Sequence, residues 1–266
     1  MTVVSLLTDF GLKDGNVGVM KGVILGLAPQ ARLVDLGHLV GAQDVREAAI
    51  LLGRSAPYFP AGSIHVVVVD PGVGTSRRPM AARLGGHFFV GPDNGVVTKL
   101  LEHVERRRGA TAFVELNHPE LWLPEVSPVF HGRDIFSPTA AHLANGVLLE
   151  SLGTPFADPV RLDFPRPTAI PGGLRGQVDH IDHFGNVRVN MRREDLDGLH
   201  PASIRIRDTT IRGLVRTFGE RSPGELIALY GSTGDLVLAV VNGSAAARLE
   251  TAVGDLVEVV REAGGS

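Results

Sequence analysis

The first half of the chain alternates short apolar segments with amphipathic ones. The apolar segments predict strands at 3–7, 32–36, 64–69, 87–90 and 112–116. Apolar positions with helical spacing predict helices at 18–28, 44–56, about 95–107 and 135–144. Pro29 ends the first helix, and Asp44 is placed to cap the second. This alternation predicts an N-terminal α/β/α domain, in which a mostly parallel sheet lies between helices.

The pattern changes after residue 160. Residues 161–176 contain three prolines and three glycines, a composition typical of a linker. Beyond it the helical periodicity nearly vanishes, and strands are predicted at 177–181, 187–190, 203–207, 226–229, 236–241 and 256–260. We therefore expect an α/β domain over 1–163, a linker over 164–173, and a smaller all-β barrel or sandwich domain over 174–266.

Composition narrows the function classes. Of the 266 residues, 44% are hydrophobic and 21% charged, which excludes a disordered chain. The net charge is −3, and the one dense basic run, 106–108, lies at a predicted helix end, so we expect no nucleic-acid partner. With no cysteine, disulfides and thiolate chemistry are excluded. No apolar run is long enough for a membrane span and no signal peptide is evident, so we expect a cytoplasmic protein without a membrane partner.

Chemistry-bearing residues cluster where predicted strands end, which is where ligands bind in α/β folds. Asp9, Asp14 and Asn16 follow the first strand, and a carboxylate there can accept the hydroxyls of a ribose. An Asx turn or a helix cap at Asp14 or Asn16 explains the same residues equally well. A second such loop, 91–95, reads Gly-Pro-Asp-Asn-Gly, which predicts either a turn before the next helix or a ligand contact.

The segment 70–77 follows the most apolar strand. Asp70 ends that strand, and Pro71, Gly72 and Gly74 turn the backbone sharply. The third glycine of the dinucleotide-binding pattern is missing and no helix pattern follows, which excludes that fingerprint. A buried aspartate is costly unless paired, and Arg77 is near enough to pair with it. The pair is either part of a reaction centre or a structural lock on the loop.

Two further regions carry polar and aromatic residues. His131, Arg133 and Asp134 precede a predicted helix, whose N-terminus favours negative charge. In the second domain, Phe184 and Asn186 could stack on a base and bind its edge, although a hairpin turn explains the same segment. The segments 230–232 and 241–244 flank a predicted strand and also fit ordinary turns.

Taken in order along nearly the whole chain, these segments resemble the S-adenosyl-L-methionine (SAM) hydroxide adenosyltransferases, or adenosine-forming SAM hydrolases. That family is related to the fluorinases and chlorinases. The resemblance implies that water displaces L-methionine from C5′ of the ribose, with SAM as substrate and no cofactor or metal. The Asp–Arg–His set of the family matches Asp70, Arg77 and His131. Asp70 would orient the water and accept its proton, Arg77 would keep Asp70 ionised, and His131 would orient the water or relay the proton.

The resemblance also implies binding roles for residues of both domains. Asp9 would hold the ribose hydroxyls, Asp14 and Asn16 the methionine end, Asp182 the substrate ammonium, and Ser232 the methionine carboxylate; Asn186, Asn242, Ser244, Phe184 and Phe218 would form the adenine site. Gln43 stands where the halogenating relatives carry a tryptophan, and those relatives lack the Asp–Arg–His set, which favours water over halide. The resemblance further implies a homotrimer, with the site between neighbouring subunits.

Three other functions remain open from the residues alone. Ten histidines and the strand-end aspartates Asp9, Asp70 and Asp134 would suit a metal-dependent hydrolase, but no His-x-x-x-His spacing occurs. A non-catalytic adenosyl-ligand sensor would bind SAM without turnover. A halide-dependent SAM halogenase would use the same fold with a different nucleophile.

Overall fold

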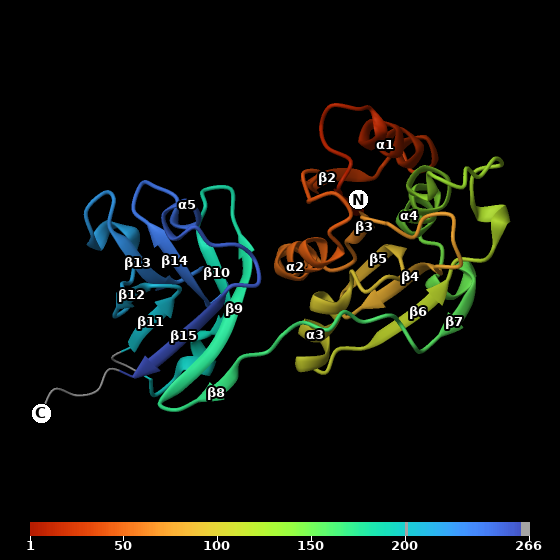
Figure 1. The fold of residues 1–266 in the computed structure, drawn as a ribbon. Coiled ribbons are helices and arrows are strands. Elements are labelled where there is room, and N and C mark those ends of the chain that lie inside the picture. Colours follow the sequence, from red (N-terminus) through yellow and green to blue (C-terminus); the bar gives the residue numbers. More distant parts are fainter. Residues whose placement is uncertain (200–201, 262–266) are drawn as a thin grey trace, which may run out of the picture. The chain divides into compact units, whose positions relative to one another are not determined.

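The protein consists of two compact units, Met1–Leu162 and Asp163–Ser266. The computed structural model describes residues 1–199 and 202–261. The segment 164–173, indicated as a linker by its prolines and glycines, contributes strand β8 (Thr168–Ile170), which pairs with β9 (Gly173–Ile181). Figure 1 shows the helices and strands of both units.

The described part of the N-terminal unit contains one mixed sheet with the strand order β2-β1-β3-β5-β4-β6-β7. Its strands are β1 (Val3–Thr8), β2 (Arg32–Gly37), β3 (Ile64–Val68), β4 (Pro79–Leu84), β5 (His87–Pro92), β6 (Thr111–Glu115) and β7 (Thr154–Phe156). The neighbours β2, β1, β3 and β5 are parallel, whereas β4 is antiparallel to both β5 and β6. Five strands therefore run in one direction, which confirms a mostly parallel sheet, and β4 and β7 run in the other.

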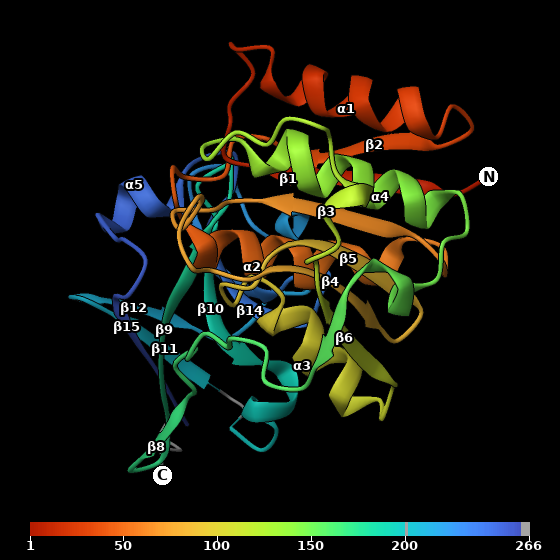
Figure 2. The same cartoon turned by 90° about the vertical axis from the view of Figure 1, so that its right-hand side faces the viewer.

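Helices cover both faces of this sheet, as the sequence predicts (Figure 2). The helices are α1 (Asn16–Leu27), α2 (Val45–Ser55), α3 (Thr98–Arg106) and α4 (Ser137–Ala144). Alternate residues of β3 enter two separate cores. Val66 and Val68 pack in the core that contains residues of α1 and α4, whereas Val67 packs in the core of α2 and α3. This two-sided burial explains the unbroken apolar run of β3.

His65 is a polar exception inside that run. Its ring is fully buried, and Nδ1 lies 2.6 Å from Ser5 Oγ, while Nε2 lies 3.3 Å from His87 Nδ1. The edge of the ring packs against Phe59. Burial, with a smaller contribution from the charge of His87, lowers the pKa of His65 from 6.5 to about 3. The imidazole is therefore neutral in the folded protein down to acidic pH.

We expect the free energy of unfolding to fall as the pH drops below about 6.5. The unfolded chain protonates His65 near its ordinary pKa of 6.5, whereas the folded chain does so only near 3, so the unfolded state binds more protons in this window. The loss at pH 5 is about 2 kcal/mol relative to neutral pH. Urea unfolding between pH 7.5 and 5 measures it. The His65→Asn variant, which retains a polar group toward Ser5, should lose this part of the slope, and an unchanged slope would contradict the assignment.

The C-terminal unit is built from antiparallel strands in the order β12-β11-β15-β9-β10-β14-β13. Besides β8 and β9, the strands are β10 (Val187–Arg192), β11 (Ala202–Ile206), β12 (Thr209–Arg212), β13 (Leu226–Tyr230), β14 (Asp235–Val240) and β15 (Leu256–Arg261). The two end strands approach each other, because Val215 N, just after β12, donates to Ala228 O of β13 over 2.9 Å. The sheet is therefore nearly closed, which confirms the predicted all-β barrel-like domain.

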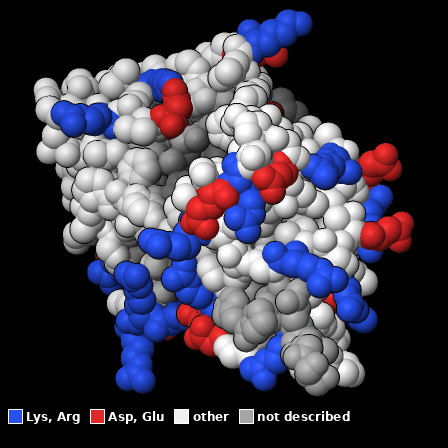
Figure 3. All heavy atoms as spheres, turned by 90° about the vertical axis from the view of Figure 1, so that its left-hand side faces the viewer, with Lys and Arg blue, Asp and Glu red and all other residues white. Residues whose placement is uncertain are grey.

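Short helical pieces complete the described chain. Helix α5 (Ala245–Leu249) follows β14, and Ser244 caps it by accepting a hydrogen bond from Ala247 N. Single 3₁₀ turns occupy Ala56–Tyr58, Pro119–Leu121, Leu149–Leu152, Arg193–Leu196 and Phe218–Glu220. Basic and acidic side chains both occur on the face shown in Figure 3, and surface arginines such as Arg175 form ion pairs. Among the described residues, none of the helices has the length and hydropathy needed to cross a membrane.

Candidate active site

The loops after β1 and β3 meet the segment before α4. The rings of Phe10 and Phe130 pack edge to face with centroids 5.7 Å apart. Gly132 lies against the end of β3, where an added Cβ would stand 3.3 Å from Val68 Cγ1. Asp9, Asp70 and His131 thus belong to segments gathered at the carboxyl ends of the parallel strands, where α/β folds bind ligands.

Asp70, Arg77 and His131 form one hydrogen-bonded group, in which the side chains of Asp70 and Arg77 are buried and His131 is half-buried. Arg77 Nε donates to Asp70 Oδ1 over 3.1 Å, and Nη2 donates to Oδ2 in a short contact. Nη2 also lies 3.2 Å from His131 Nδ1. Only 4% of the Asp70 side chain and 7% of the Arg77 side chain are exposed. The bidentate pairing offsets the cost of burying the carboxylate.

The backbone holds this group from two sides. Gly74 has a φ of +74°, and an added Cβ would stand 2.2 Å from the carbonyl oxygen of Pro128. The turn that carries Asp70 therefore contacts the segment that leads to His131 so closely that only glycine fits. On the other side, the guanidinium carbon of Arg77 lies 5.5 Å from the centroid of the buried Phe136 ring. Both contacts limit the movement of Arg77.

The contact with Arg77 fixes the tautomer of His131. An arginine only donates hydrogen bonds, so Nδ1 must accept and the neutral ring carries its proton on Nε2. Burial, followed by the charge of Arg77, lowers the pKa of His131, although Asp70 and Asp134 act in the opposite direction. The ring is thus neutral near pH 7 and offers an Nε2–H donor.

Arg77 and Asp70 retain groups for a ligand. Arg77 Nη1 is buried and meets no acceptor in the described ranges. A buried donor of this kind favours a bound oxygen or water, because leaving it unpaired is costly. A carboxylate has about four lone-pair sites, and Arg77 takes two of those on Asp70. Asp70 can therefore accept a hydrogen bond from a water, whereas Arg77 Nη1, on the far side of the guanidinium from Asp70, is a donor for a different ligand atom.

The other charged residues beside His131 are structural. Asp134 is fully buried, accepts hydrogen bonds from Arg133 Nε over 2.6 Å and from Ser127 N over 2.9 Å, and lies in a π-helical turn, Gly132–Phe136. Its carboxylate thus closes the loop before His131. In the described part of the chain, no three His, Asp or Glu side chains are grouped as metal ligands.

The carboxylate of Asp9, in the loop after β1, is held by the main chain of Gln43. Asp9 Oδ2 accepts a hydrogen bond from Gln43 N over 2.8 Å, and Gln43 has a φ of +63°. Asp14 and Asn16 are exposed, and helix α1 begins with Gly15 as its N-cap and no side-chain cap, so neither residue has the predicted capping role. The structure leaves both side chains accessible on the surface.

The loop 91–95 is a structural turn. Buried Asp93 accepts from Arg78 Nε over 2.9 Å and from Val160 N over 2.8 Å. Asn94 Nδ2 donates to Val69 O over 2.9 Å and ties the ends of β3 and β5 together. The turn interpretation explains every one of these contacts.

In the C-terminal unit, four of the proposed binding residues lie together. Asp182 Oδ1 accepts from Phe184 N over 2.9 Å, and Asp182 Oδ2 accepts from Asn186 Nδ2 over 2.9 Å. Gly185, with a φ of +79°, packs so closely on Ser244 that an added Cβ would stand 2.0 Å from Ser244 Oγ. The carboxylate of Asp182 thus forms its hydrogen bonds within the hairpin turn. Phe184, at the tip of this turn, is 73% exposed.

The remaining proposed residues are spread around this unit. Asn242 has a φ of +55° and lies just after β14, beside Ser244. Ser232 lies just before β14, so the six residues of that strand, a span of roughly 20 Å, separate it from Asn242. Phe218 is 41% exposed in the turn between β12 and β13. A ligand that contacted both ends of β14 would have to be extended.

Sequence patterns did not indicate Phe136, Pro128 or the backbone of Gln43 as parts of this arrangement. The sequence around Phe136 indicates only an apolar position in the core of a helix. Pro128 and Gln43 contribute main-chain atoms, which no sequence pattern marks. The signal that exists is indirect: a glycine at 74 next to a predicted buried charge indicates a close approach by another segment.

Comparisons with known proteins match both units. Residues 4–153 match the SAM hydroxide adenosyltransferase N-terminal domain, and residues 176–258 match the corresponding C-terminal domain. The chain is 42% identical over 260 residues to the (R)-S-adenosyl-L-methionine hydrolase of Salinispora tropica, covering 96% of this chain and 97% of that protein. It is 41% identical over 248 residues to the protein of that name from Thermus thermophilus, covering 92% and 94%.

More distant similarity extends to halogenating enzymes and to solved structures. The fluorinase of an Actinoplanes species is 28% identical over 222 residues, covering 73% of each chain. A crystal structure of an uncharacterized conserved protein from Thermotoga maritima has a TM-score of 0.89 at 35% identity, covering 97% of this chain and all of the other.

Proposed function

The chain belongs to the SAM hydroxide adenosyltransferase family, and from this premise we propose that it is an enzyme that hydrolyses S-adenosyl-L-methionine to adenosine and L-methionine. The observation that carries the proposal is the hydrogen-bonded Asp70–Arg77–His131 group, in which a carboxylate held by an arginine lies beside a neutral imidazole. The names of relatives at 41–42% identity support the same substrate.

The chemistry needs only an aligned nucleophile, because a sulfonium is already a good leaving group. The water oxygen forms a bond to C5′ as the C5′–S bond breaks, and the bonding pair remains on the sulfur of methionine. Asp70 accepts the proton of the water and passes it to solvent after the reaction. Arg77 holds Asp70 in place through two hydrogen bonds, and His131 Nε2–H is the donor that orients the water oxygen.

Substrate binding draws on both units in this proposal. In the N-terminal unit Asp9 binds the ribose hydroxyls and exposed Asp14 and Asn16 bind the methionine end. In the C-terminal unit Phe184 and Phe218 pack on the adenine, and Asn186, Asn242 and Ser244 bind its edge. Asp182 is assigned to the ammonium of methionine. Ser232, assigned by the resemblance to the methionine carboxylate, lies at the other end of β14, roughly 20 Å away, so one copy does not bring both residues to the same methionine. A homotrimer, in which neighbouring copies complete each site, is part of the proposal.

The direct experiment is incubation of the purified protein with SAM, with adenosine and methionine followed by chromatography. Both products should appear in equal amounts, and their rate of formation should be unchanged by a chelator. No adenosine above a protein-free control would refute the proposal. A halogenase is the second candidate, since fluorinases are among the relatives. Adding chloride or fluoride tests it, and we expect no 5′-halogenated adenosine.

We expect the (R) sulfonium epimer of SAM to be consumed faster than the (S) epimer. The sulfur carries three different substituents and a lone pair, so only one epimer can place methionine and C5′ correctly on a fixed set of contacts. The relatives are named for the (R) form. A mixture of both epimers, sampled over time by chiral chromatography, measures the ratio of rates. Equal rates would show that the site does not distinguish the configuration at sulfur.

A further inference from the structure

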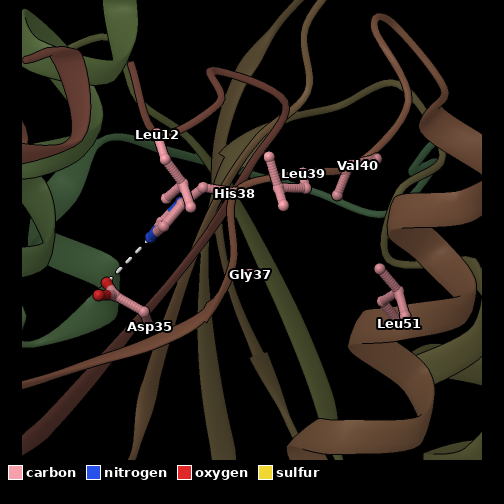
Figure 4. A pocket seen from close by; sticks show the side chains of 7 residues that line it. All are labelled: Leu12, Asp35, Gly37, His38, Leu39, Val40 and Leu51. Atoms are coloured by element: carbon pink, nitrogen blue, oxygen red, sulfur yellow. Dashed lines mark ion pairs between the residues drawn. The ribbon is translucent and has the colours of Figure 1, made fainter. Parts of the chain in front are cut away.

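His38 connects the ends of two neighbouring strands. It directly follows β2, and only 4% of its side chain is exposed. Nδ1 lies 3.0 Å from Oγ1 of Thr8, the last residue of β1, and Nε2 lies 2.9 Å from Asp35 Oδ1 on β2 (Figure 4). Asp35 and His38 form the polar part of a hollow of about 360 Å³ that is otherwise lined mainly by leucine and valine side chains.

Thr8 links the loop to the ring of His38. Its Oγ1 accepts from Phe10 N over 3.2 Å and is hydrogen-bonded to His38 Nδ1 over 3.0 Å. On the other side of the ring, Nε2 approaches the carboxylate of Asp35 without forming a hydrogen bond to any described residue. That carboxylate accepts from Lys21 Nζ on α1 over 2.7 Å. A continuous chain of contacts thus runs from α1 to the start of the loop after β1.

The main chain of His38 supports the same loop. Gly11 N donates to His38 O over 2.7 Å, so both ends of the segment 8–11 are attached to this one residue. Asp9 lies between these two attachments, and its carboxylate is oriented by Gln43 N. The position of the Asp9 carboxylate therefore depends on residues that follow β2.

We propose that His38 is a positioning residue, which holds the loop of Asp9 where its carboxylate binds the two hydroxyls of a ribose. The ribose assignment rests on the proposed function, whereas the control of the loop by His38 rests on the contacts above. A purely structural role for His38 would affect stability without a preference for ligands that have these hydroxyls.

Two amide substitutions separate the two contacts of the ring. His38→Gln places its amide near the position of Nε2, so it retains the Asp35 contact and loses the Thr8 contact. His38→Asn places its amide near Nδ1 and does the reverse. We expect His38→Gln to raise KM for SAM about tenfold, the effect of one lost hydrogen bond, with kcat nearly unchanged. His38→Asn should stay close to the unmodified protein.

Binding of adenosine and of 2′,3′-dideoxyadenosine, measured by calorimetry, provides the selective readout. His38→Gln should bind adenosine about tenfold more weakly than the unmodified protein does, and it should bind the dideoxy compound with unchanged affinity. Equal weakening of both ligands, or equal effects of the Gln and Asn variants, would overturn the proposal.

Hydrogen exchange over residues 9–12 tests the loop without any ligand. Amide exchange in this segment should be faster in His38→Gln than in His38→Asn, because only the first variant loses the Thr8 contact. Identical exchange in the two variants would overturn the proposal whatever the substrate is. Failure of the proposed function would show differently, as an unmodified protein that forms no adenosine from SAM while the exchange difference persists.

Discussion

Replacing Arg77 with methionine is expected to lower kcat for SAM hydrolysis by roughly a thousandfold, the range observed when a preorganised charge or catalytic base is removed. The substitution keeps most of the apolar stem and removes the contacts with Asp70 and with His131. Asp70, whose side chain is 4% exposed, loses its counter-charge and both of the hydrogen bonds that hold its carboxylate. His131 Nδ1 loses its donor, so the ring no longer has a fixed tautomer.

Steady-state assays with chromatographic detection of adenosine measure this loss. Arg77→Lys retains the charge but not the bidentate geometry, and we expect it to recover only part of the rate. Arg175→Met is a matched control. Arg175 is an exposed arginine of the C-terminal unit, and it forms an ion pair with Glu258 of the same unit. Its activity should equal that of the unmodified protein. An Arg77→Met enzyme within tenfold of that rate would remove Arg77 from the mechanism.

Combining two inactive variants in one assembly is expected to restore activity. Asp70→Asn removes the proposed base in the N-terminal unit, and the double variant Phe184→Ala/Asn186→Ala removes the proposed adenine contacts in the C-terminal unit. Each should be nearly inactive alone. If neighbouring copies complete each site around a ring, every mixed trimer contains one site with both halves intact, so about a third of the activity returns.

Co-expression with two different affinity tags, followed by purification on both, isolates the mixed assemblies. The recovered fraction also reports the number of subunits, because a mixed dimer of the same kind would recover about a half. No recovery above the two separate variants would show that each site is built within one chain. Light scattering on the unmodified protein provides an independent mass of the assembly.

Burial explains which parts of the fold are predictable from the sequence. The five predicted strands of the N-terminal unit are the five that run in one direction, and central strands such as β3 are apolar on both faces. Strand β4 was missed because it starts at Pro79, contains small alanines and carries Arg83 at an exposed position. The other missed strands, β7, β8 and β12, have only three or four residues and expose at least half of them.

The candidate site was predictable where its partners are close in sequence. Asp70 and Arg77 are seven residues apart, and the cost of a buried charge was enough to suggest their pairing. His131 is 54 positions from Arg77, and only a family resemblance placed it in the same group. Contacts between distant segments leave no periodic signal in the sequence. They determine the tautomer of His131, the packing of Phe136 against Arg77, and the attachment of the loop 8–11 to His38.

The contact between Gly74 and the carbonyl of Pro128 has a consequence for the dynamics of turnover. Two main-chain segments in direct contact do not behave as a hinge, so Asp70, the proposed base, and the imidazole of His131 share one support. The barrier to reaction should then contain little protein reorganisation energy, and the chemical step should be insensitive to solvent viscosity. Any viscosity dependence of turnover would have to come from the entry of substrate or the release of adenosine and methionine.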